Sequence, residues 1–324
     1  MRRHGRLLAG FGVLSNRAHA PASPVTPFGK YPLTESSPAP ASRHNNQELH
    51  TRLLADVAQD LSGEVSFPTT LDLAIKMRNT FKKSGVTLEE LERIVALEPL
   101  IASKLLHLAN SPAFNQTAKP VNDLFAAIES LGLEQARAAS LAVAMDQIMK
   151  SKNLAAFDKF AKLNWEHSIR CAVLARALAR HVGRIDPEEA MLAGLVHDIG
   201  VYYLFYRASQ YSEYRDDQDA LIELVLGWHE AIGESVLEAL GFPERICEAL
   251  RDHDCPRVME RDPRNLSDIV YVANLLGGSN WEWLPNTTTS AQRQAMESTR
   301  QRYAFLLPAA QHEIDEMHAA LGEH

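Results

Sequence analysis

Ala193-Gly194-Leu195-Val196-His197-Asp198-Ile199-Gly200 places a histidine and an aspartate side by side at the end of an apolar helical segment. The start of this helix is well marked. Asp186 is a favourable N-cap, Pro187 suits the first helical turn, and Glu189 completes the spacing of a capping box. Gly200 is expected to end the helix in the left-handed conformation. The stretch therefore predicts a short helix that finishes at the His-Asp pair.

The inward face of this helix carries both polar side chains toward the interior. At about 3.6 residues per turn, one stripe is formed by Ala190, Ala193, Gly194 and His197. The helix therefore delivers the imidazole of His197 and the carboxylate of Asp198 into the core at its last turn. An unpaired buried carboxylate is costly, whereas metal coordination or hydrogen bonding makes it tolerable. The pair thus predicts further polar side chains at the same place.

Histidines on three other expected helices fall on equally apolar stripes. His167 is followed one turn later by Cys171 in the segment 165–181, and His229 lies in the segment that begins at Asp219. The whole set comprises His167, His197, Asp198, His229 and His253. Imidazole and carboxylate ligands suit zinc, iron or manganese, and helical bundles build such sites from facing helices. A single histidine on an apolar face is more commonly a core residue with one hydrogen bond, so periodicity alone leaves both interpretations open.

Length and composition describe a chain that can bury a large core. The 324 residues suffice for one large or two ordinary domains, and 46% of them are hydrophobic. The formal charge of −8 argues against a dedicated nucleic-acid surface. No apolar run approaches the length needed to span a bilayer, so no membrane association is expected. The three cysteines lack the paired spacing of a metal site. They are Cys171, Cys247 and Cys255, and we expect them to be reduced thiols in a cytoplasmic protein.

The chain divides into a leader and two helical parts. Residues 1–46 are expected to be a disordered leader, because prolines recur there between serine, alanine and polar residues. The leader imitates a signal peptide only faintly, so no targeting role is assigned to it. Helical periodicity then predicts an N-terminal helical subdomain over 47–150 and a second helical subdomain with C-terminal helices over 151–324. The expected fold class is all-α.

The order of the polar residues along the second part is specific. The succession His167, His197-Asp198, His229, His253, with the string His197-Asp198-Ile199-Gly200, resembles the HD superfamily of metal-dependent phosphohydrolases. Other segments narrow the resemblance to the HDOD domain, a degenerate branch found in bacterial signalling proteins. Those segments are Phe67-Pro68-Thr69-Thr70, Glu98–Leu106, Asn110-Ser111-Pro112, Ala127–Gly132, Trp165–Ser168 and Gly241-Phe242-Pro243. The resemblance extends from about Leu61 to Leu276.

The resemblance implies an N-terminal helical subdomain packed on an HD-type helical subdomain, and it implies a set of ligands. In active members of the superfamily, the first histidine, the His-Asp pair and a late aspartate bind the principal metal. Those positions match His167, His197, Asp198 and Asn274 here, and His229 and His253 match further ligands. Where related phosphodiesterases often have two adjacent histidines, this chain has His253-Asp254, so Asp254 could also be a ligand.

Two departures from the pattern weaken hydrolysis more than they weaken metal binding. The late position is an amide, Asn274, and a neutral amide oxygen donates less charge to a divalent cation than a carboxylate does. The lysine that commonly follows the HDIG string is replaced by Val201, which removes a phosphate-binding cation. A divalent metal (iron, manganese or zinc) is therefore expected to be weakly held or absent.

Two functions from different classes follow from this resemblance. The favoured hypothesis is a non-catalytic regulator that acts through contact with signalling proteins or through a small, nucleotide-type ligand. Its rival is a metal-dependent phosphohydrolase or phosphodiesterase acting on nucleotides or cyclic dinucleotides. In that enzyme His197 and Asp198 would hold a metal, and His229 or His253 would complete a second site. Nucleic-acid association through the arginine-bearing leader is a third hypothesis.

Overall fold

The computed structural model describes residues 40–62, 87–115, 119–149, 152–240, 242–278 and 289–321. Within these ranges all regular structure is helical and no strand occurs, which confirms the all-α prediction. No helix in the described part of the chain is long and apolar enough to cross a membrane. The motif at 67–70 and most of the expected leader lie outside the described residues.

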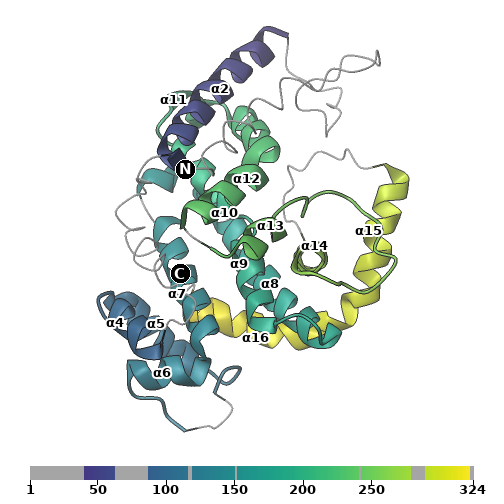
Figure 1. The fold of residues 1–324 in the computed structure, drawn as a ribbon. Coiled ribbons are helices and arrows are strands. Elements are labelled where there is room, and N and C mark those ends of the chain that lie inside the picture. The colour runs from purple at the N-terminus through teal and green to yellow at the C-terminus, as the bar shows by residue number, and fades with distance from the viewer. Residues whose placement is uncertain are drawn as a thin grey trace.

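Four helices form a group at one end of the molecule, at the lower left of Figure 1. They are α4 (Leu88–Val95), α5 (Pro99–Asn110), α6 (Leu124–Leu131) and α7 (Leu133–Met149). Side-chain caps start two of them, because Thr87 accepts a hydrogen bond from the Glu90 amide and Asp123 accepts one from the Ala126 amide. Gly132, at a φ of 82°, turns the chain from α6 into α7. Two caps and a glycine, which are local features of the sequence, therefore mark where α4, α6 and α7 begin.

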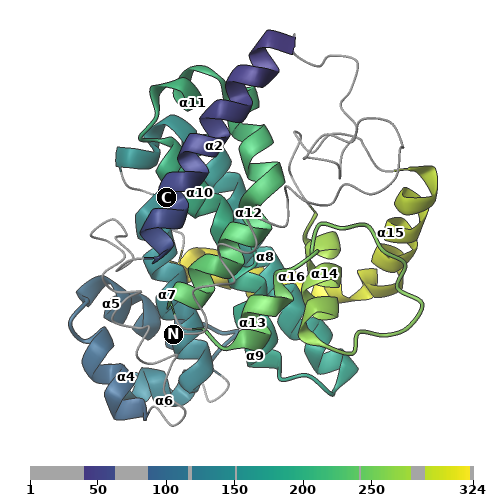
Figure 2. The ribbon, with the colours of Figure 1, turned by 45° about the horizontal axis from the view of Figure 1, so that its top comes forward.

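The second group of helices surrounds the long helix α8 (Asp158–Val182). Its other members are η2 (Lys152–Phe157), α9 (Pro187–Val196), α10 (Ile199–Ala208), α11 (Ser212–Asp216), α12 (Gln218–Leu240), α13 (Glu244–Ala249) and α14 (Leu266–Gly277). Helix α8 packs against α9 and α14, and α10 packs against α12. Helix α13 links the two pairs through contacts with α12 and α14. The helices that carry the candidate residues are therefore direct neighbours (Figure 2).

The first described helix, α2 (Pro40–Ser62), packs on α10 and α12 (Figures 1 and 2). His50 supports this contact through a 3.0 Å hydrogen bond between its Nε2 atom and the Ala220 carbonyl. The helix begins at Pro40, inside the expected leader, since proline is well tolerated in the first turn of a helix. The sequence pattern assigns this segment to the N-terminal subdomain, whereas these contacts join it to the second group.

The C-terminal helices lead the chain back to the first group. Helix α15 (Ser290–Tyr303) contacts α14, and η3 (Ala304–Leu306) continues into α16 (Leu307–Leu321). Helix α16 runs across α8 and reaches α5 and α7 (Figure 1). The last helix of the chain therefore connects the two groups.

A buried guanidinium fixes this junction. Arg176 on α8 donates hydrogen bonds to Glu188 on α9 at 2.9 Å and to Glu313 on α16 at 2.7 Å. It also donates to the side-chain oxygen of Gln135 on α7 at 3.2 Å. The three contacts hold α7, α9 and α16 around α8. Loss of any partner would leave a buried charge uncompensated, which is strongly destabilising.

Two glycines let the helices on either side of the His-Asp pair approach their neighbours closely. A Cβ atom on Gly194 would lie 2.7 Å from the carbonyl oxygen of Cys171 on α8. A Cβ atom on Gly200 would lie 2.0 Å from the carbonyl oxygen of His229 on α12. Both distances are too short for any side chain, so these contacts require glycine. They bring the link between α9 and α10 directly against α8 and α12.

The expectation that Gly200 ends a helix in the left-handed conformation is wrong. Helix α9 ends at Val196, the His-Asp pair links it to α10, and Gly200 lies in the first turn of α10. Its φ is not among the positive values found for described glycines. The physical reason for a glycine here is the close contact with α12 rather than the turn.

Replacing Gly200 tests the contact between α10 and α12. Gly200→Ala is expected to lower the free energy of unfolding by about 3 kcal/mol, the upper end of the usual cost of overpacking, because the added Cβ collides with backbone atoms. Gly227→Ala is the matched control, since Gly227 is exposed within α12 and alanine there should stabilise the helix by about 0.5–1 kcal/mol. Chemical denaturation measures both changes. A Gly200→Ala variant as stable as the wild type would contradict the close approach.

Candidate metal centre

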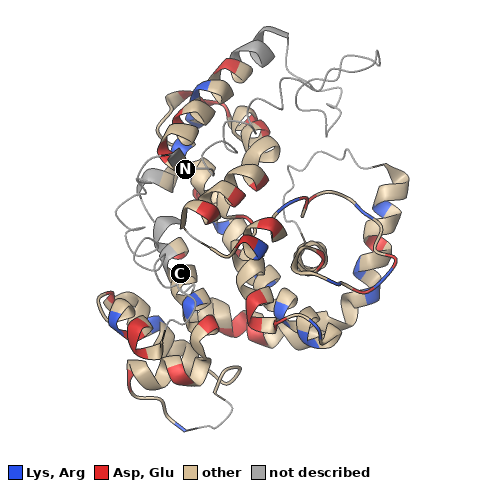
Figure 3. Ribbon diagram, in the orientation of Figure 1, with Lys and Arg blue, Asp and Glu red and all other residues tan. Residues whose placement is uncertain are grey.

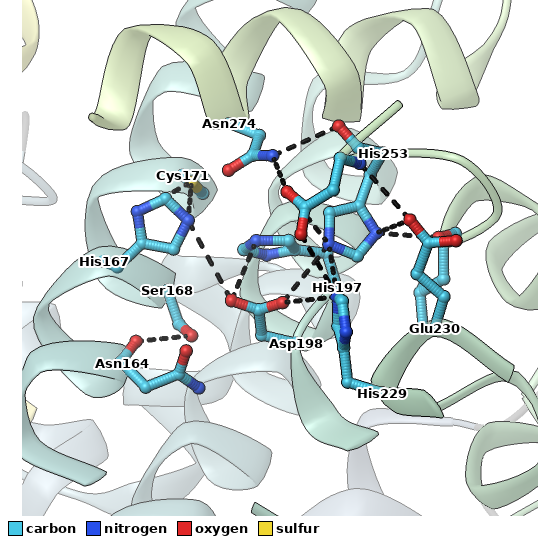
Figure 4. Close-up of polar contacts among 12 residues, drawn as sticks. Asn164, His167, Ser168, Cys171, His197, Asp198, His229, Glu230, His253 and Asn274 are labelled. Atoms are coloured by element: carbon cyan, nitrogen blue, oxygen red, sulfur yellow. Dashed lines mark hydrogen bonds and ion pairs between the residues drawn. The ribbon is translucent and has the colours of Figure 1, made fainter. Parts of the chain in front are cut away.

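Polar side chains from five parts of the second group meet in its interior (Figure 4). They are His167 on α8, His197 and Asp198 in the link between α9 and α10, His229 on α12, His253 and Asp254 after α13, and Asn274 on α14. His197 is fully buried and Asp198 is 3% exposed. The structure thus brings together every candidate residue that the sequence pattern and the resemblance select.

Asp198 lies at the centre of this cluster, and each of its carboxylate oxygens faces a different pair of imidazoles. Its Oδ2 lies 3.3 Å from His197 Nε2 and 4.0 Å from His167 Nε2. Its Oδ1 lies 3.2 Å from His253 Nε2 and 3.9 Å from His229 Nε2. One carboxylate therefore joins two groups of donor atoms (Figure 4).

A second carboxylate, that of Asp254, lies beside His229 and His253. Its Oδ2 is 3.3 Å from His229 Nε2, and the Nε2 atoms of the two histidines are 3.4 Å apart. Asn274 donates from Nδ2 to Asp254 Oδ1 at 2.9 Å and to the His253 carbonyl at 3.1 Å. The side-chain nitrogen of Asn274 therefore holds Asp254 in place within the cluster.

The four imidazoles are all held by the same kind of hydrogen bond. In each ring Nδ1 contacts a backbone carbonyl, which fixes Nδ1 as the protonated nitrogen and leaves Nε2 facing the carboxylates. The carbonyls belong to Gly278, Gly194, Val225 and Leu250, at 3.1, 2.7, 2.9 and 2.7 Å from the Nδ1 atoms of His167, His197, His229 and His253 respectively. Metal-binding histidines are typically held in this way by a hydrogen bond from the nitrogen that does not bind the metal.

Glu230 orients the turn that carries His253 and Asp254. Its carboxylate accepts hydrogen bonds from the amides of Asp252 and Asp254, each at 3.3 Å, and lies 3.9 Å from His253 Nδ1. Asp252 has a φ of 56°, a left-handed conformation that aspartate tolerates better than most residues. Because Glu230 follows His229 directly on α12, the same turn of helix places one histidine and supports the other.

Burial and neighbouring charges set the protonation of the cluster. Burial lowers the pKa of His197 to about 4, so this imidazole is neutral at neutral pH. Burial also opposes charge on His253, but the carboxylates of Asp254 and Asp198 outweigh it and raise the pKa of His253 to about 10. Burial would raise the pKa values of Asp198 and Asp254, but the imidazoles hold both well below the usual range. The two carboxylates therefore require positive charge, from imidazolium protons or from a metal ion.

The donor atoms fit the divalent metal that the resemblance implies. Three overlapping groups have their ligand atoms within 4.8 Å of one another: His197, Asp198 and His253; His229, Glu230, His253 and Asp254; and His167, Cys171 and His197. Imidazole nitrogen combined with carboxylate oxygen suits zinc, iron or manganese. In addition, His197 Nε2 has no hydrogen-bond partner among the described residues, although it is buried. A bound cation would satisfy this nitrogen.

Two residues of this region are absent from the site predicted by sequence. Cys171 lies one helical turn after His167, and its Sγ is 3.3 Å from His167 Nε2. The His-Cys spacing of four residues on one helical face is a signal that could have identified it. Glu230 could have been identified only from its position next to His229, because its contacts are with a turn far along the chain.

Solved structures share this fold. A "Putative metal-dependent phosphohydrolase" from Shewanella amazonensis SB2B matches with a TM-score of 0.65 and 20% identity, over 86% of this chain and 99% of that one. An HDOD domain protein with unknown function from Geobacter sulfurreducens matches with a TM-score of 0.55 and 21% identity, over 85% and 98%. A "Putative signal transduction protein" from Marinobacter aquaeolei VT8 matches with a TM-score of 0.54 and 15% identity, over 100% and 67%. These similarities establish the fold alone.

Sequence comparison settles the family. No curated protein is matched by the sequence. The HDOD domain model, however, matches residues 67–256, which is more than half of the chain and includes the His-Asp pair, His229 and His253. The matched range also covers helices α4 to α13, so it joins the first group of helices to most of the second. The chain belongs to the HDOD domain family.

Proposed function

We propose that this chain is a non-catalytic regulatory protein, which transmits a signal through contact with a partner protein or through a small bound ligand. In this proposal the cluster around Asp198 binds a divalent metal (iron, manganese or zinc) in a structural role. The observation that carries the proposal is the hydrogen bond from Asn274 Nδ2 to Asp254 Oδ1 at 2.9 Å. An amide, and not a carboxylate, stands at the late ligand position, and its nitrogen faces the other acidic residue.

The amide at position 274 reduces the negative charge available to a metal. A neutral amide stabilises a divalent cation less than a carboxylate does, and the hydrogen bond from Asn274 occupies a lone pair of Asp254. Position 201 supports the same interpretation. Val201 is apolar and 1% exposed, where a lysine commonly follows the HDIG string in the superfamily. A phosphate at the cluster would lack that cation.

Burial of the cluster also supports a regulatory role. The side chains of His167, His197 and His253 are at most 2% exposed, and that of Asp254 is 20% exposed. A phosphohydrolase must admit a charged phosphate and a water molecule to its metal, whereas a structural metal site is closed by protein ligands. The enclosed arrangement therefore favours a metal that stabilises the fold.

The alternative is a phosphohydrolase that acts on nucleotides or cyclic dinucleotides. The observation that favours it is the division of the donor atoms into two groups on either side of Asp198. Two-metal hydrolases hold their ions about 3.5–4 Å apart, and the ions polarise the phosphoryl group and activate water. The similar fold of the Shewanella amazonensis protein, which is described as a phosphohydrolase, is compatible with this alternative.

We also propose domain bounds, a cellular location and a class of partner for the chain. We place residues 1–46 as a leader that overlaps the start of α2, 47–150 as the N-terminal subdomain and 151–324 as the HD-type subdomain with its C-terminal helices. The contacts of α2 with α10 and α12 favour moving the segment 40–62 to the second subdomain. We also propose a cytoplasmic location and a signalling protein as partner. The net charge of −8, with Lys and Arg residues scattered among Asp and Glu residues over the described helices (Figure 3), supports the proposal that nucleic acid is not a partner.

Hydrolysis assays separate the two functions. The protein supplied with manganese or iron is expected to release no more phosphate from nucleotides, and to open no more cyclic dinucleotide, than the Asp198→Ala variant does. The expectation follows from the amide at position 274 and from the burial of the cluster. Turnover in the wild type that Asp198→Ala abolishes would establish the phosphohydrolase instead.

Replacing the amide at position 274 by a carboxylate should lower the stability of the metal-free protein and raise its affinity for metal. In Asn274→Asp the hydrogen bond to Asp254 becomes a repulsion between two carboxylates, which should cost the metal-free protein at least about 2 kcal/mol of unfolding free energy. A bound metal relieves the repulsion, so metal affinity should rise. Thermal denaturation with and without metal measures both effects.

Asn265→Asp provides the matched control for that experiment. It makes the same change of charge at the exposed N-cap of α14, where aspartate caps as well as asparagine. This variant should retain the stability and the metal affinity of the wild type. If Asn274→Asp behaves like Asn265→Asp, residue 274 lies outside the metal's coordination sphere.

Metal affinity is expected to rise with pH. The pKa of His253 is raised to about 10, so its imidazole carries a proton that a metal at Nε2 must displace, and the pKa of His229 is also raised. Competition from protons weakens as the pH increases, so affinity should grow between about pH 6 and pH 8, with release of protons. Calorimetry in two buffers of different ionisation enthalpy counts those protons. Binding that neither varies with pH nor releases protons would exclude both imidazoles as ligands.

A further inference from the structure

Cys171 places a buried sulfur atom beside the cluster. It lies four residues after His167 on α8, so both side chains project from the same face of the helix. Its Sγ is 3.3 Å from His167 Nε2, and the side chain is 1% exposed. Figure 4 shows the sulfur next to the His167 ring, on the side of the cluster that faces α14.

On α14 this sulfur has only a weak partner. Its hydrogen bond to His167 Nε2 at 3.3 Å lies on α8, whereas its acceptor on α14, the Ala273 carbonyl, is 3.7 Å away. Gly277 lies over the pair, and a Cβ there would be 3.0 Å from Cys171 Sγ and 3.5 Å from the His167 ring. A glycine at this position keeps α14 close to the thiol and the imidazole without covering them with a side chain.

A second atom points to a ligand at the same place. His197 Nε2 is fully buried, lies 3.3 Å from Asp198 Oδ2 and has no hydrogen-bond partner among the described residues. The ligand atoms of His167, Cys171 and His197 all lie within 4.8 Å of one another. An unsatisfied buried nitrogen, a thiol and a second imidazole therefore lie together, and Asp198 Oδ2 adjoins the two imidazoles.

We propose that Cys171 is a ligand of the metal, and that it completes a tetrahedral zinc site with His167, His197 and Asp198. Zn–S bonds of about 2.3 Å and Zn–N or Zn–O bonds of about 2.0–2.1 Å place sulfur about 3.5 Å from nitrogen, and nitrogen about 3.3 Å from oxygen. The observed separations are 3.3 Å from sulfur to His167 Nε2 and 3.3 Å from His197 Nε2 to Asp198 Oδ2. His167 Nε2 is 4.0 Å from the same oxygen. Asp198 is not part of the group whose ligand atoms lie within 4.8 Å of the sulfur, so its carboxylate must move toward Cys171 when zinc binds.

The thiolate compensates for the missing carboxylate at position 274. On coordination the thiol proton leaves for solvent and the S–Zn bond forms, with no change of oxidation state. Cys171 and Asp198 then supply two negative charges to the divalent ion, the number that two carboxylates would supply. Sulfur selects zinc over manganese, which prefers oxygen ligands.

This ligand set has a consequence for function. Four protein ligands fill a tetrahedral zinc ion, and structural zinc sites differ from catalytic ones in keeping no open position for water. The inference rests on the metal site of the proposed function and deepens it, because a closed site stabilises the fold and does not activate water.

Cobalt substitution tests the sulfur ligand directly. Co²⁺ bound by a thiolate gives an intense near-ultraviolet charge-transfer band, which cobalt bound only by nitrogen and oxygen lacks. The chain has three cysteines, so the double variant Cys247→Ala/Cys255→Ser retains Cys171 as its only thiol. The full-length double variant loaded with cobalt is expected to show the band with the intensity of the wild type. Cys171→Ala should lose the band and bind cobalt at least about tenfold more weakly.

The outcomes of this experiment are distinct. A double variant that binds cobalt without the band would overturn the role of Cys171 while leaving the metal site intact. Failure of the wild type to bind cobalt or zinc would overturn both the sulfur ligand and the metal site. Phosphate release that depends on Asp198 is assayed separately, and would contradict the non-catalytic role whatever the spectrum shows. The double variant tests the sulfur ligand even where Cys171→Ala does not fold.

Discussion

The buried carboxylate of Asp198 is the constraint on which the rest of the site depends. A carboxylate that is 3% exposed is stable only where charges or hydrogen bonds replace its water. Four imidazoles provide that replacement, and each is aimed by its own backbone carbonyl. The close contacts at Gly194 and Gly200 set the distances from α9 to α8 and from α10 to α12. Any larger residue would separate the helices that carry those imidazoles.

Local features of this architecture could be predicted from the sequence, and long-range ones could not. Capping residues locate the start of α9 at Asp186, because a cap depends on neighbours in sequence, whereas the helix expected at 165–181 begins seven residues after the start of α8. Which stripes face each other is not a local property, and only the resemblance to the HDOD family suggested that the histidines converge. The docking of α2 depends on His50 and Ala220, which are 170 residues apart, and the role of Gly200 depends on α12. No local pattern reports either contact.

Membership of the HDOD family and the chemistry of the cluster are separate questions. The fold fixes the points from which side chains enter the site, and the residue at each point decides what the site can do. By the resemblance to the HD hydrolases, Asn274 on α14 takes the place of a carboxylate, and on α8 a thiol lies next to the first histidine. In the site that we propose, a thiolate in place of that carboxylate keeps the charge and the number of ligands, and tetrahedral zinc with four protein ligands has no open position for water.

The role that we propose for the cluster around Asp198 requires a bound metal ion. Diffraction data from crystals of the full chain, collected on either side of the zinc, iron and manganese absorption edges, locate such an ion and identify it. We expect an anomalous peak within bonding distance of Asp198 and of His197 Nε2. Crystals grown with stoichiometric metal that show no peak there, or a peak only at the molecular surface, would contradict it.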